Sequence, residues 1–176
     1  MRRLGFAQII NLSKEMKQRP KIYKDESGDP WIDFTIEHDS VMIDLGANVG
    51  FISGGWLDAI GKKVDIICFE PNPHAFKVLQ EKFKYNSNVK CVVEMIDFCA
   101  FLKKLKEKRK VSFIKMDIEG GEVALLKELL DQKLLDDIQV TVEAHDQKMP
   151  ELKEGTDALR ERIEREGLTN IVLEHP

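Results

Sequence analysis

Short apolar and β-branched runs alternate with helical patterns along most of the chain, and this alternation constrains the fold more than any other feature. The runs cover residues 41–45, 64–69, 89–96, 111–116, 138–143 and 170–173. Strands that are apolar on both faces and separated by amphipathic helices are typical of a parallel sheet with helices on both sides. Ligands of such sheets bind beyond the carboxyl ends of the strands, so the residues that follow each run are the candidates for function.

Three segments between the runs place apolar residues at helical spacing. They cover residues 73–85, 120–131 and 156–166. In the second segment Val123, Leu126 and Leu130 share one helical face, and Gly167 is placed to end the third. Residues 1–38 have a different pattern, which predicts a helix over 3–17 and a hairpin over 21–37 with its turn at residues 26–30. We therefore expect an N-terminal helix and hairpin cap at 1–38 and one α/β domain at 39–176.

Composition excludes several classes of protein. A chain of 176 residues is long enough to bury a real core, and no apolar run is long enough to cross a bilayer. The start of the chain lacks the pattern of a signal peptide, so we expect a cytoplasmic protein that does not bind membranes. The formal charge of −4 argues against nucleic acid as the main partner, and the basic run 103–110 falls at the end of a predicted helix, where cations are favoured. Cys68, Cys91 and Cys99 lack metal-ligand spacing and are expected to be reduced core residues.

The first apolar run leads into a glycine-rich turn, Asp44-Leu45-Gly46-Ala47-Asn48-Val49-Gly50, and the second ends in Glu70. A glycine lets the backbone approach a ligand closely because it has no Cβ. An acid about 20 residues beyond such a turn, at the end of the next strand, is placed to accept the hydroxyls of a ribose. A dinucleotide fingerprint that starts at Gly46 needs glycines at positions 48 and 51, where the chain has Asn48 and Phe51. The turn and Glu70 therefore predict a nucleoside site, but not one for NAD.

Ionisable side chains follow two later runs. Asp117 and Glu119 end one strand, and Glu143 and His145 end another. Burying ionisable groups at strand ends costs free energy, so we expect them either to pair with an opposite charge or to take part in the protein's function. One use is a general base that removes the proton of an acceptor hydroxyl, for which the ordinary pKa of His145 is suited. The other is a divalent cation that lowers the pKa of that hydroxyl. No tight ligand spacing demands a metal, so we assign no metal site from the sequence.

A structural role competes with the chemical one for two of the acids in this region. Glu119 and Glu122 fall near the start of a predicted helix, where a carboxylate stabilises the helix dipole with no further role. For Glu122 this interpretation is preferred, and Glu119 is kept as a supporting candidate for catalysis.

Four sequence blocks together resemble a known family. The blocks are Asp44-Leu45-Gly46-Ala47-Asn48-Val49-Gly50, Phe69-Glu70-Pro71-Asn72-Pro73, Ile114-Lys115-Met116-Asp117-Ile118-Glu119-Gly120-Gly121-Glu122 and Val142-Glu143-Ala144-His145. In this order they resemble the signatures of the FkbM-type class I methyltransferases, which depend on S-adenosylmethionine. The resemblance implies a compact three-layer Rossmann-like sheet and the O-methylation of a hydroxyl, on a small molecule or a sugar.

The resemblance also implies roles for individual residues. Gly46, Asn48 and Gly50 would form the turn against the methionine moiety, Asp44 would orient that turn from beneath, and Glu70 would bind the ribose hydroxyls. The cofactor-binding residues are then expected to be Asp44, Gly46, Ala47, Asn48, Gly50, Glu70, Pro71 and Asp117. The catalytic candidates are His145 and Asp117, with Glu143 and Glu119 in support.

The chain also departs from the family pattern. The segment between the second and third blocks is shorter than usual, so part of the middle of the fold is expected to be missing. Asp97 is the nearest counterpart of the acid that flanks adenine, in a context that also suits the start of a helix. No run remains for the final antiparallel strand, which leaves an open sheet edge and predicts a homodimer. A binding module that holds S-adenosylmethionine without transferring its methyl group is therefore the alternative function. Trp31 and Trp56 suit either the acceptor pocket or the core.

Overall fold

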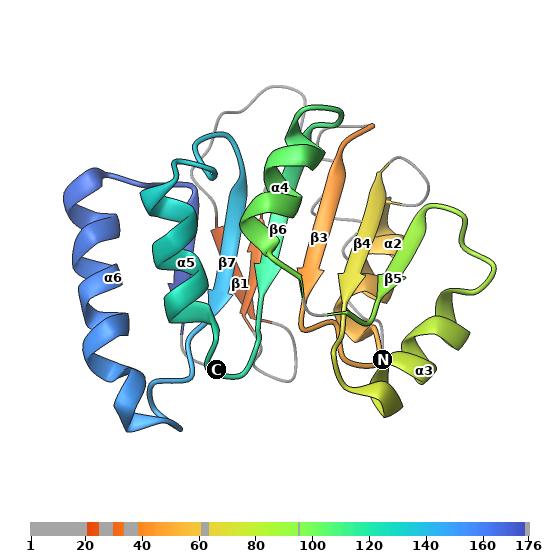
Figure 1. Cartoon of the computed structure of the whole chain (residues 1–176), viewed down its shortest axis with the longest axis horizontal. Coiled ribbons are helices and arrows are strands. Elements are labelled where there is room, and N and C mark those ends of the chain that lie inside the picture. The colour runs from red at the N-terminus through yellow and green to blue at the C-terminus, as the bar shows by residue number, and fades with distance from the viewer. Residues whose placement is uncertain (1–20, 25–29, 34–38, 61–63, 95, 175–176) are drawn as a thin grey trace.

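The structure, a computed structural model, describes residues 21–24, 30–33, 39–60, 64–94 and 96–174. Its centre is a six-stranded sheet with the strand order β5-β4-β3-β6-β7-β8, in which every neighbouring pair is parallel (Figure 1). The strands are β3 (Val41–Leu45), β4 (Asp65–Phe69), β5 (Val89–Val92), β6 (Val111–Met116), β7 (Gln139–Glu143) and β8 (Ile171–Glu174). The predicted parallel sheet is confirmed, and so is each of its six apolar runs as a strand.

One predicted run is longer than the strand that it forms. The run 89–96 gives a strand only as far as Val92 because Val92 pairs with Phe69, the last residue of β4. Beyond that point β4 offers no further partner in the ladder. The described residues 93, 94, 96 and 97 form neither helix nor strand, and α4 (Phe98–Lys106) follows at once. This direct passage from β5 to α4 agrees with the expected loss of part of the middle of the fold.

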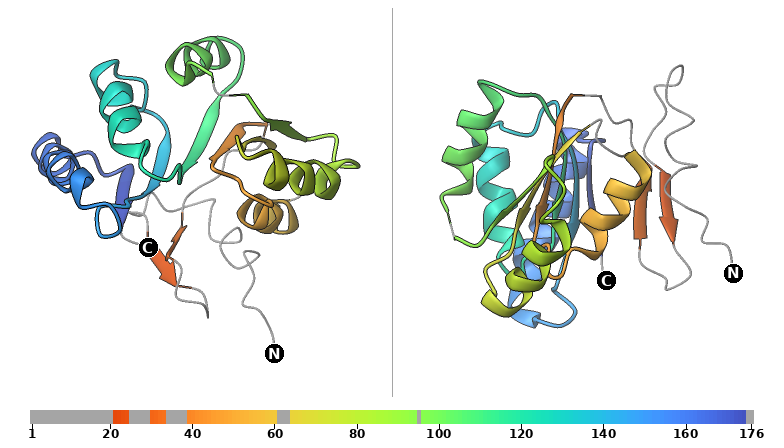
Figure 2. Two further views of the ribbon diagram at one scale, coloured as in Figure 1. Left: turned by 60° about the horizontal axis from the view of Figure 1, so that its bottom comes forward. Right: turned by 90° about the vertical axis from the view of Figure 1, so that its right-hand side faces the viewer.

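Helices cover both faces of the sheet and make the three expected layers. One face carries α2 (Phe51–Ile60) and α3 (Pro73–Phe83), and the other carries α4, α5 (Glu122–Asp131) and α6 (Lys153–Glu166) (Figure 2). Local chemistry sets the ends of these helices. The side chain of Asp97 accepts a hydrogen bond from the N–H of Ala100 and begins α4, so Asp97 is a helix cap in this fold. Gly167 ends α6 with φ of 65°, as its place in the sequence predicts.

Two apolar cores lie on the two faces of the sheet. On the side of α2 and α3, the buried ring of Trp56 packs edge-on against Phe113 with 5.4 Å between the ring centroids. Trp56 is therefore a core residue and does not line a pocket, whereas the side chain of Trp31 lies outside the described residues. All three cysteines are free, and Cys68 and Cys99 are buried, which confirms the prediction of reduced core cysteines for these two; Cys91 is half-buried.

The N-terminal region contributes a separate two-stranded sheet. β1 (Lys21–Lys24) pairs antiparallel with β2 (Pro30–Asp33), which confirms the predicted hairpin in these strands. The helix predicted over 3–17 falls outside the described residues, and the division at residue 38 stays a prediction. Among the described helices, none combines the length and apolar character that a bilayer-spanning helix needs.

Candidate functional site

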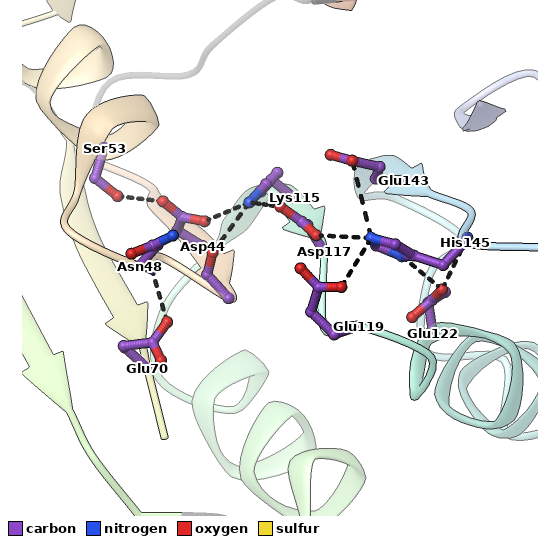
Figure 3. Close-up of polar contacts among 11 residues, drawn as sticks. Asp44, Asn48, Ser53, Glu70, Lys115, Asp117, Glu119, Glu122, Glu143 and His145 are labelled. Atoms are coloured by element: carbon purple, nitrogen blue, oxygen red, sulfur yellow. Dashed lines mark hydrogen bonds and ion pairs between the residues drawn. The ribbon is translucent and has the colours of Figure 1, made fainter. Parts of the chain in front are cut away.

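The carboxyl ends of β3, β4, β6 and β7 meet at one edge of the sheet, and the predicted site residues gather there (Figures 1 and 3). Because all strands run parallel, residues from four distant parts of the sequence become neighbours. Glu70 contacts Asn48, and a separate series of polar contacts extends from Asp44 through Lys115 and Asp117 to His145. The site therefore has two halves, which meet at Asp117.

The glycine turn after β3 has left-handed backbone at three positions. The φ angles are 80° at Gly46, 49° at Asn48 and 76° at Gly50. A Cβ at Gly46 would lie 1.6 Å from the carbonyl oxygen of Asp117, so this position admits no side chain while β6 stays in place. The first glycine is thus required by contact between the turn and the end of β6.

Glu70 holds the turn from the side of β4. Its Oε2 accepts a hydrogen bond of 2.7 Å from the N–H of Asn48, and its Oε1 accepts one of 2.8 Å from the N–H of Asn72. A carboxylate has about four lone-pair positions, so each oxygen retains the capacity to accept one more hydrogen bond. Glu70 is buried and fixed by these two backbone donors. It therefore presents a preorganised pair of acceptors beside the turn.

Asp44 lies fully buried beneath the turn, where its two oxygens have different partners. Oδ2 accepts a hydrogen bond of 2.5 Å from the hydroxyl of Ser53 in α2, and Oδ1 lies 3.5 Å from Nζ of Lys115 in β6. Nζ of Lys115 also donates to the carbonyl oxygen of Gly46 at 3.1 Å and to Oδ2 of Asp117 at 3.0 Å. Asp44 thus lies beneath the turn, and Lys115 links its carboxylate to the carbonyl oxygen of Gly46.

Lys115 carries positive charge into this half-buried position. Burial alone lowers the pKa of its ammonium group, but the carboxylates of Asp44 and Asp117 outweigh burial and hold that pKa above its ordinary value. The ammonium group therefore stays charged and ties the turn to the end of β6.

His145 forms the centre of the other half of the site. Its side chain is 1% exposed, and Nδ1 lies 2.9 Å from Oε1 of Glu122, whose side chain is completely buried. The same oxygen accepts a hydrogen bond from the N–H of His145, and Oε2 accepts one of 2.7 Å from the N–H of Gly120. The bond to Gly120 agrees with a structural role for Glu122 at the start of α5. Its two bonds to His145 add a second role, which is to fix the imidazole ring.

The other ring nitrogen, Nε2, faces three carboxylates. Oε2 of Glu119 lies 3.3 Å away, Oδ1 of Asp117 3.6 Å and Oε1 of Glu143 3.9 Å. Burial and the nearby charge of Asp117 raise the pKa of Glu143, although His145 and two lysines oppose the shift. The structure thus brings together all four residues that the sequence nominates for catalysis.

Comparison with known proteins identifies the family. The family model described as "Methyltransferase FkbM domain" matches residues 79–168 of this chain, which include the second half of the site. The chain belongs to the FkbM methyltransferase family. The match begins within α3, so the glycine turn and Glu70 lie before it. No curated protein matches the chain significantly.

Solved structures support the methyltransferase fold of this FkbM domain. A fibrillarin in complex with Nop5p is 18% identical, with a TM-score of 0.53 over 74% of this chain and 63% of that one. A precorrin-6y C5,15-methyltransferase from Geobacter metallireducens GS-15 is 17% identical, with a TM-score of 0.51 over 70% of this chain and 63% of that one. A methyltransferase FkbM from Methylobacillus flagellatus KT is also matched, at 20% identity and a TM-score of 0.42, over 60% of this chain and 33% of that one. The FkbM domain thus spans less than two thirds of the length of each of these proteins.

Three residues of the FkbM site have contacts that the sequence analysis did not foresee. They are Ser53, Lys115 and Glu122 as the partner of His145. A lysine inside a mostly apolar strand was the available signal for Lys115, because such a charge needs a partner. Two expected cofactor residues have simple placements. Ala47 is buried and donates its N–H to the carbonyl oxygen of Phe69, and Pro71 is exposed after Glu70.

Proposed function

We propose that this FkbM domain binds S-adenosylmethionine at the turn after β3 and at Glu70. The observation that carries the proposal is the pair of acceptors on Glu70, fixed by two backbone donors beside the turn. These acceptors suit the two hydroxyls of a ribose. Asp44, Gly46, Ala47, Asn48, Gly50, Glu70, Pro71 and Asp117 are the residues proposed to hold the cofactor. When bound, the cofactor supplies an electrophilic methyl group on a sulfonium sulfur.

We propose further that the acceptor is a hydroxyl of a small molecule or a sugar. His145 and Asp117, with Glu143 and Glu119, would assist the loss of the hydroxyl proton, because all four side chains converge beside Nε2 of the imidazole. Glu122 would keep the ring in a single orientation. Much of the rate would come from holding the acceptor and the cofactor in attack geometry.

Calorimetric titration with S-adenosylhomocysteine tests the cofactor site. Replacing Glu70 with alanine should abolish binding, and Glu70→Gln should weaken it by about tenfold or more, because an amide replaces one acceptor oxygen by a donor. Asp44→Ala should also abolish binding through loss of the organised turn. The matched control is Glu161→Gln, which changes an exposed acid on α6 and should leave affinity unchanged. Unchanged affinity in the Glu70 and Asp44 variants would exclude this assignment.

A second candidate function is a module that binds the cofactor without transferring its methyl group. The direct passage from β5 to α4 favours it, because this part of the fold is shorter than the family pattern implies. A screen of sugars and hydroxylated small molecules with methyl-labelled cofactor separates the two functions. Label in any acceptor supports the transferase, whereas binding without transfer to any of them supports the module.

A further inference from the structure

We propose that Asp117, Glu143 and His145 form a site for a divalent transition-metal cation at the ends of β6 and β7. As a binding site it stands on the geometry of these three side chains alone. Its use in lowering the pKa of an acceptor hydroxyl rests on the proposed function.

The ligand atoms are already close to coordination distance. One atom from each of the three residues lies within 4.8 Å of the others. Nε2 of His145 is 3.6 Å from Oδ1 of Asp117 and 3.9 Å from Oε1 of Glu143. Ligands bound at about 2.1 Å to one ion lie roughly 3.0 to 3.4 Å apart in octahedral or tetrahedral geometry. The side chains of Asp117 and Glu143 are 24% and 35% exposed, so they have room to make this small inward movement.

The imidazole is oriented as a metal ligand. The contact between Nδ1 and the buried carboxylate of Glu122 favours the tautomer with its proton on Nδ1. The lone pair of Nε2 then points at carboxylate oxygens, and among the described residues none forms a hydrogen bond with this nitrogen. A lone pair that faces negative oxygens is repelled unless a proton on Nε2 or a bound cation lies between them. A carboxylate behind a ligating histidine is also the usual way in which proteins fix such a ligand.

The balance of charge favours a cation at this position. Asp117, Glu119, Glu122 and Glu143 surround His145, and of these four acids Asp117 is the one that contacts Lys115, through Oδ2. Oδ1 of Asp117 and Oε1 of Glu143 therefore keep their charge toward Nε2.

The donor set selects the class of ion. Imidazole nitrogen suits zinc and iron, whereas carboxylate oxygens suit magnesium and manganese, so a mixed set of one nitrogen and two oxygens favours Mn²⁺ or Zn²⁺ over Mg²⁺. Glu119 is 77% exposed and lies 3.3 Å from Nε2, which places a flexible carboxylate beside the proposed ion. It would accept the proton of a metal-bound hydroxyl and release it to solvent.

Calorimetric titration of the chelator-treated chain with MnCl₂, and separately with ZnCl₂, tests the site. We expect one ion per chain, with affinity lowered at least about tenfold in Glu143→Gln and in His145→Ala, because each removes a ligand. Glu122→Gln should lower metal affinity by about 10- to 100-fold, with circular dichroism and S-adenosylhomocysteine affinity unchanged, because it acts through the ring of His145. His74→Ala, at an exposed histidine on α3, and Glu161→Gln are the matched controls.

The two proposals fail separately. Absence of saturable binding of both ions to the wild-type chain, or equal affinity in wild type and Glu143→Gln, would overturn the metal site. Glu143 is partly exposed, so its variant remains informative even where His145→Ala does not fold. Loss of S-adenosylhomocysteine binding in Glu70→Ala with intact Mn²⁺ binding would support both sites. Metal binding by a chain that never binds S-adenosylhomocysteine would keep the metal site and reject the cofactor.

Discussion

Replacing Gly46 with alanine tests how tightly the turn after β3 is pressed against the end of β6. The new Cβ would lie 1.6 Å from the carbonyl oxygen of Asp117, less than half of an ordinary contact distance of 3.4 Å. Both groups belong to backbone that is hydrogen-bonded, since the N–H of Gly46 donates to Phe69 and the N–H of Asp117 donates to Leu45. Relief of the clash therefore requires movement of the turn or of the strand end.

The loss of stability in Gly46→Ala has two parts, backbone strain and overpacking, and the same substitution at Gly167 separates them. A left-handed φ costs a residue with a Cβ about 1 to 2 kcal/mol, and this applies to Gly46 and to Gly167 alike. At Gly167 a Cβ would meet nothing within 4 Å, so Gly167→Ala should show only this strain. Overpacking adds about 1 to 3 kcal/mol. Gly46→Ala should therefore destabilise the fold by about 2 to 5 kcal/mol, against about 1 to 2 kcal/mol for Gly167→Ala.

Urea and thermal unfolding of the two variants measure this difference. At about 2 to 4 °C per kcal/mol for a chain of this size, Gly46→Ala should unfold roughly 4 to 20 °C below wild type and Gly167→Ala roughly 2 to 8 °C below. Gly46→Ala should also bind S-adenosylhomocysteine more weakly, because the turn or Asp117 is displaced. Equal destabilisation by the two substitutions would refute the argument that contact with Asp117 is what requires a glycine at position 46.

Two further predictions concern the buried lysine and the sheet edge. Lys115→Met leaves the fully buried Asp44 without its counter-charge, so it should destabilise the fold by about 3 kcal/mol or more in urea unfolding; a loss below about 0.5 kcal/mol would contradict this role. A homodimer that covers an open edge of the sheet, such as β8, should appear in size-exclusion chromatography with light scattering, and a monomer at every concentration would exclude it.

The strands and helices were predictable because burial leaves a local pattern in the sequence. β3 is buried at all five positions and β6 at five of its six, and most of these positions hold apolar residues, so each appears as a largely apolar run whatever its neighbours are. The end of β5 was not predictable in this way. Val92 ends the strand because β4 stops at its partner Phe69, and that limit lies more than twenty residues away in the sequence.

In the site, too, some residues could be predicted from the local sequence, whereas contacts between distant residues could not. Site residues at the ends of strands could be predicted, because parallel topology alone brings strand ends together. These are Glu70, Asp117, Glu143 and His145. The local sequence pattern did not reveal that Glu122 fixes His145, since that contact joins residues 23 positions apart, with α5, a loop and β7 between them. The position of Glu122 at the start of a helix suggested a helix cap, and the structure shows that the same carboxylate also serves the imidazole.

The contacts of the turn after β3 show why Asn48, in place of the second glycine of a dinucleotide fingerprint, affects which ligand the turn can bind. In a dinucleotide site the second glycine lets the turn approach a pyrophosphate and use its free backbone donors. Here Asn48 occupies that position, and its N–H is already bound to Glu70 over 2.7 Å. On the β6 side of the turn, Lys115 donates a hydrogen bond to the carbonyl oxygen of Gly46 and forms ion pairs with Asp44 and Asp117. The N–H of Asn48 and the ammonium group of Lys115 are therefore both already bound within the protein and are not available to a pyrophosphate. Glu70 can still accept hydrogen bonds from hydroxyl groups. Together these contacts favour a nucleoside without phosphate.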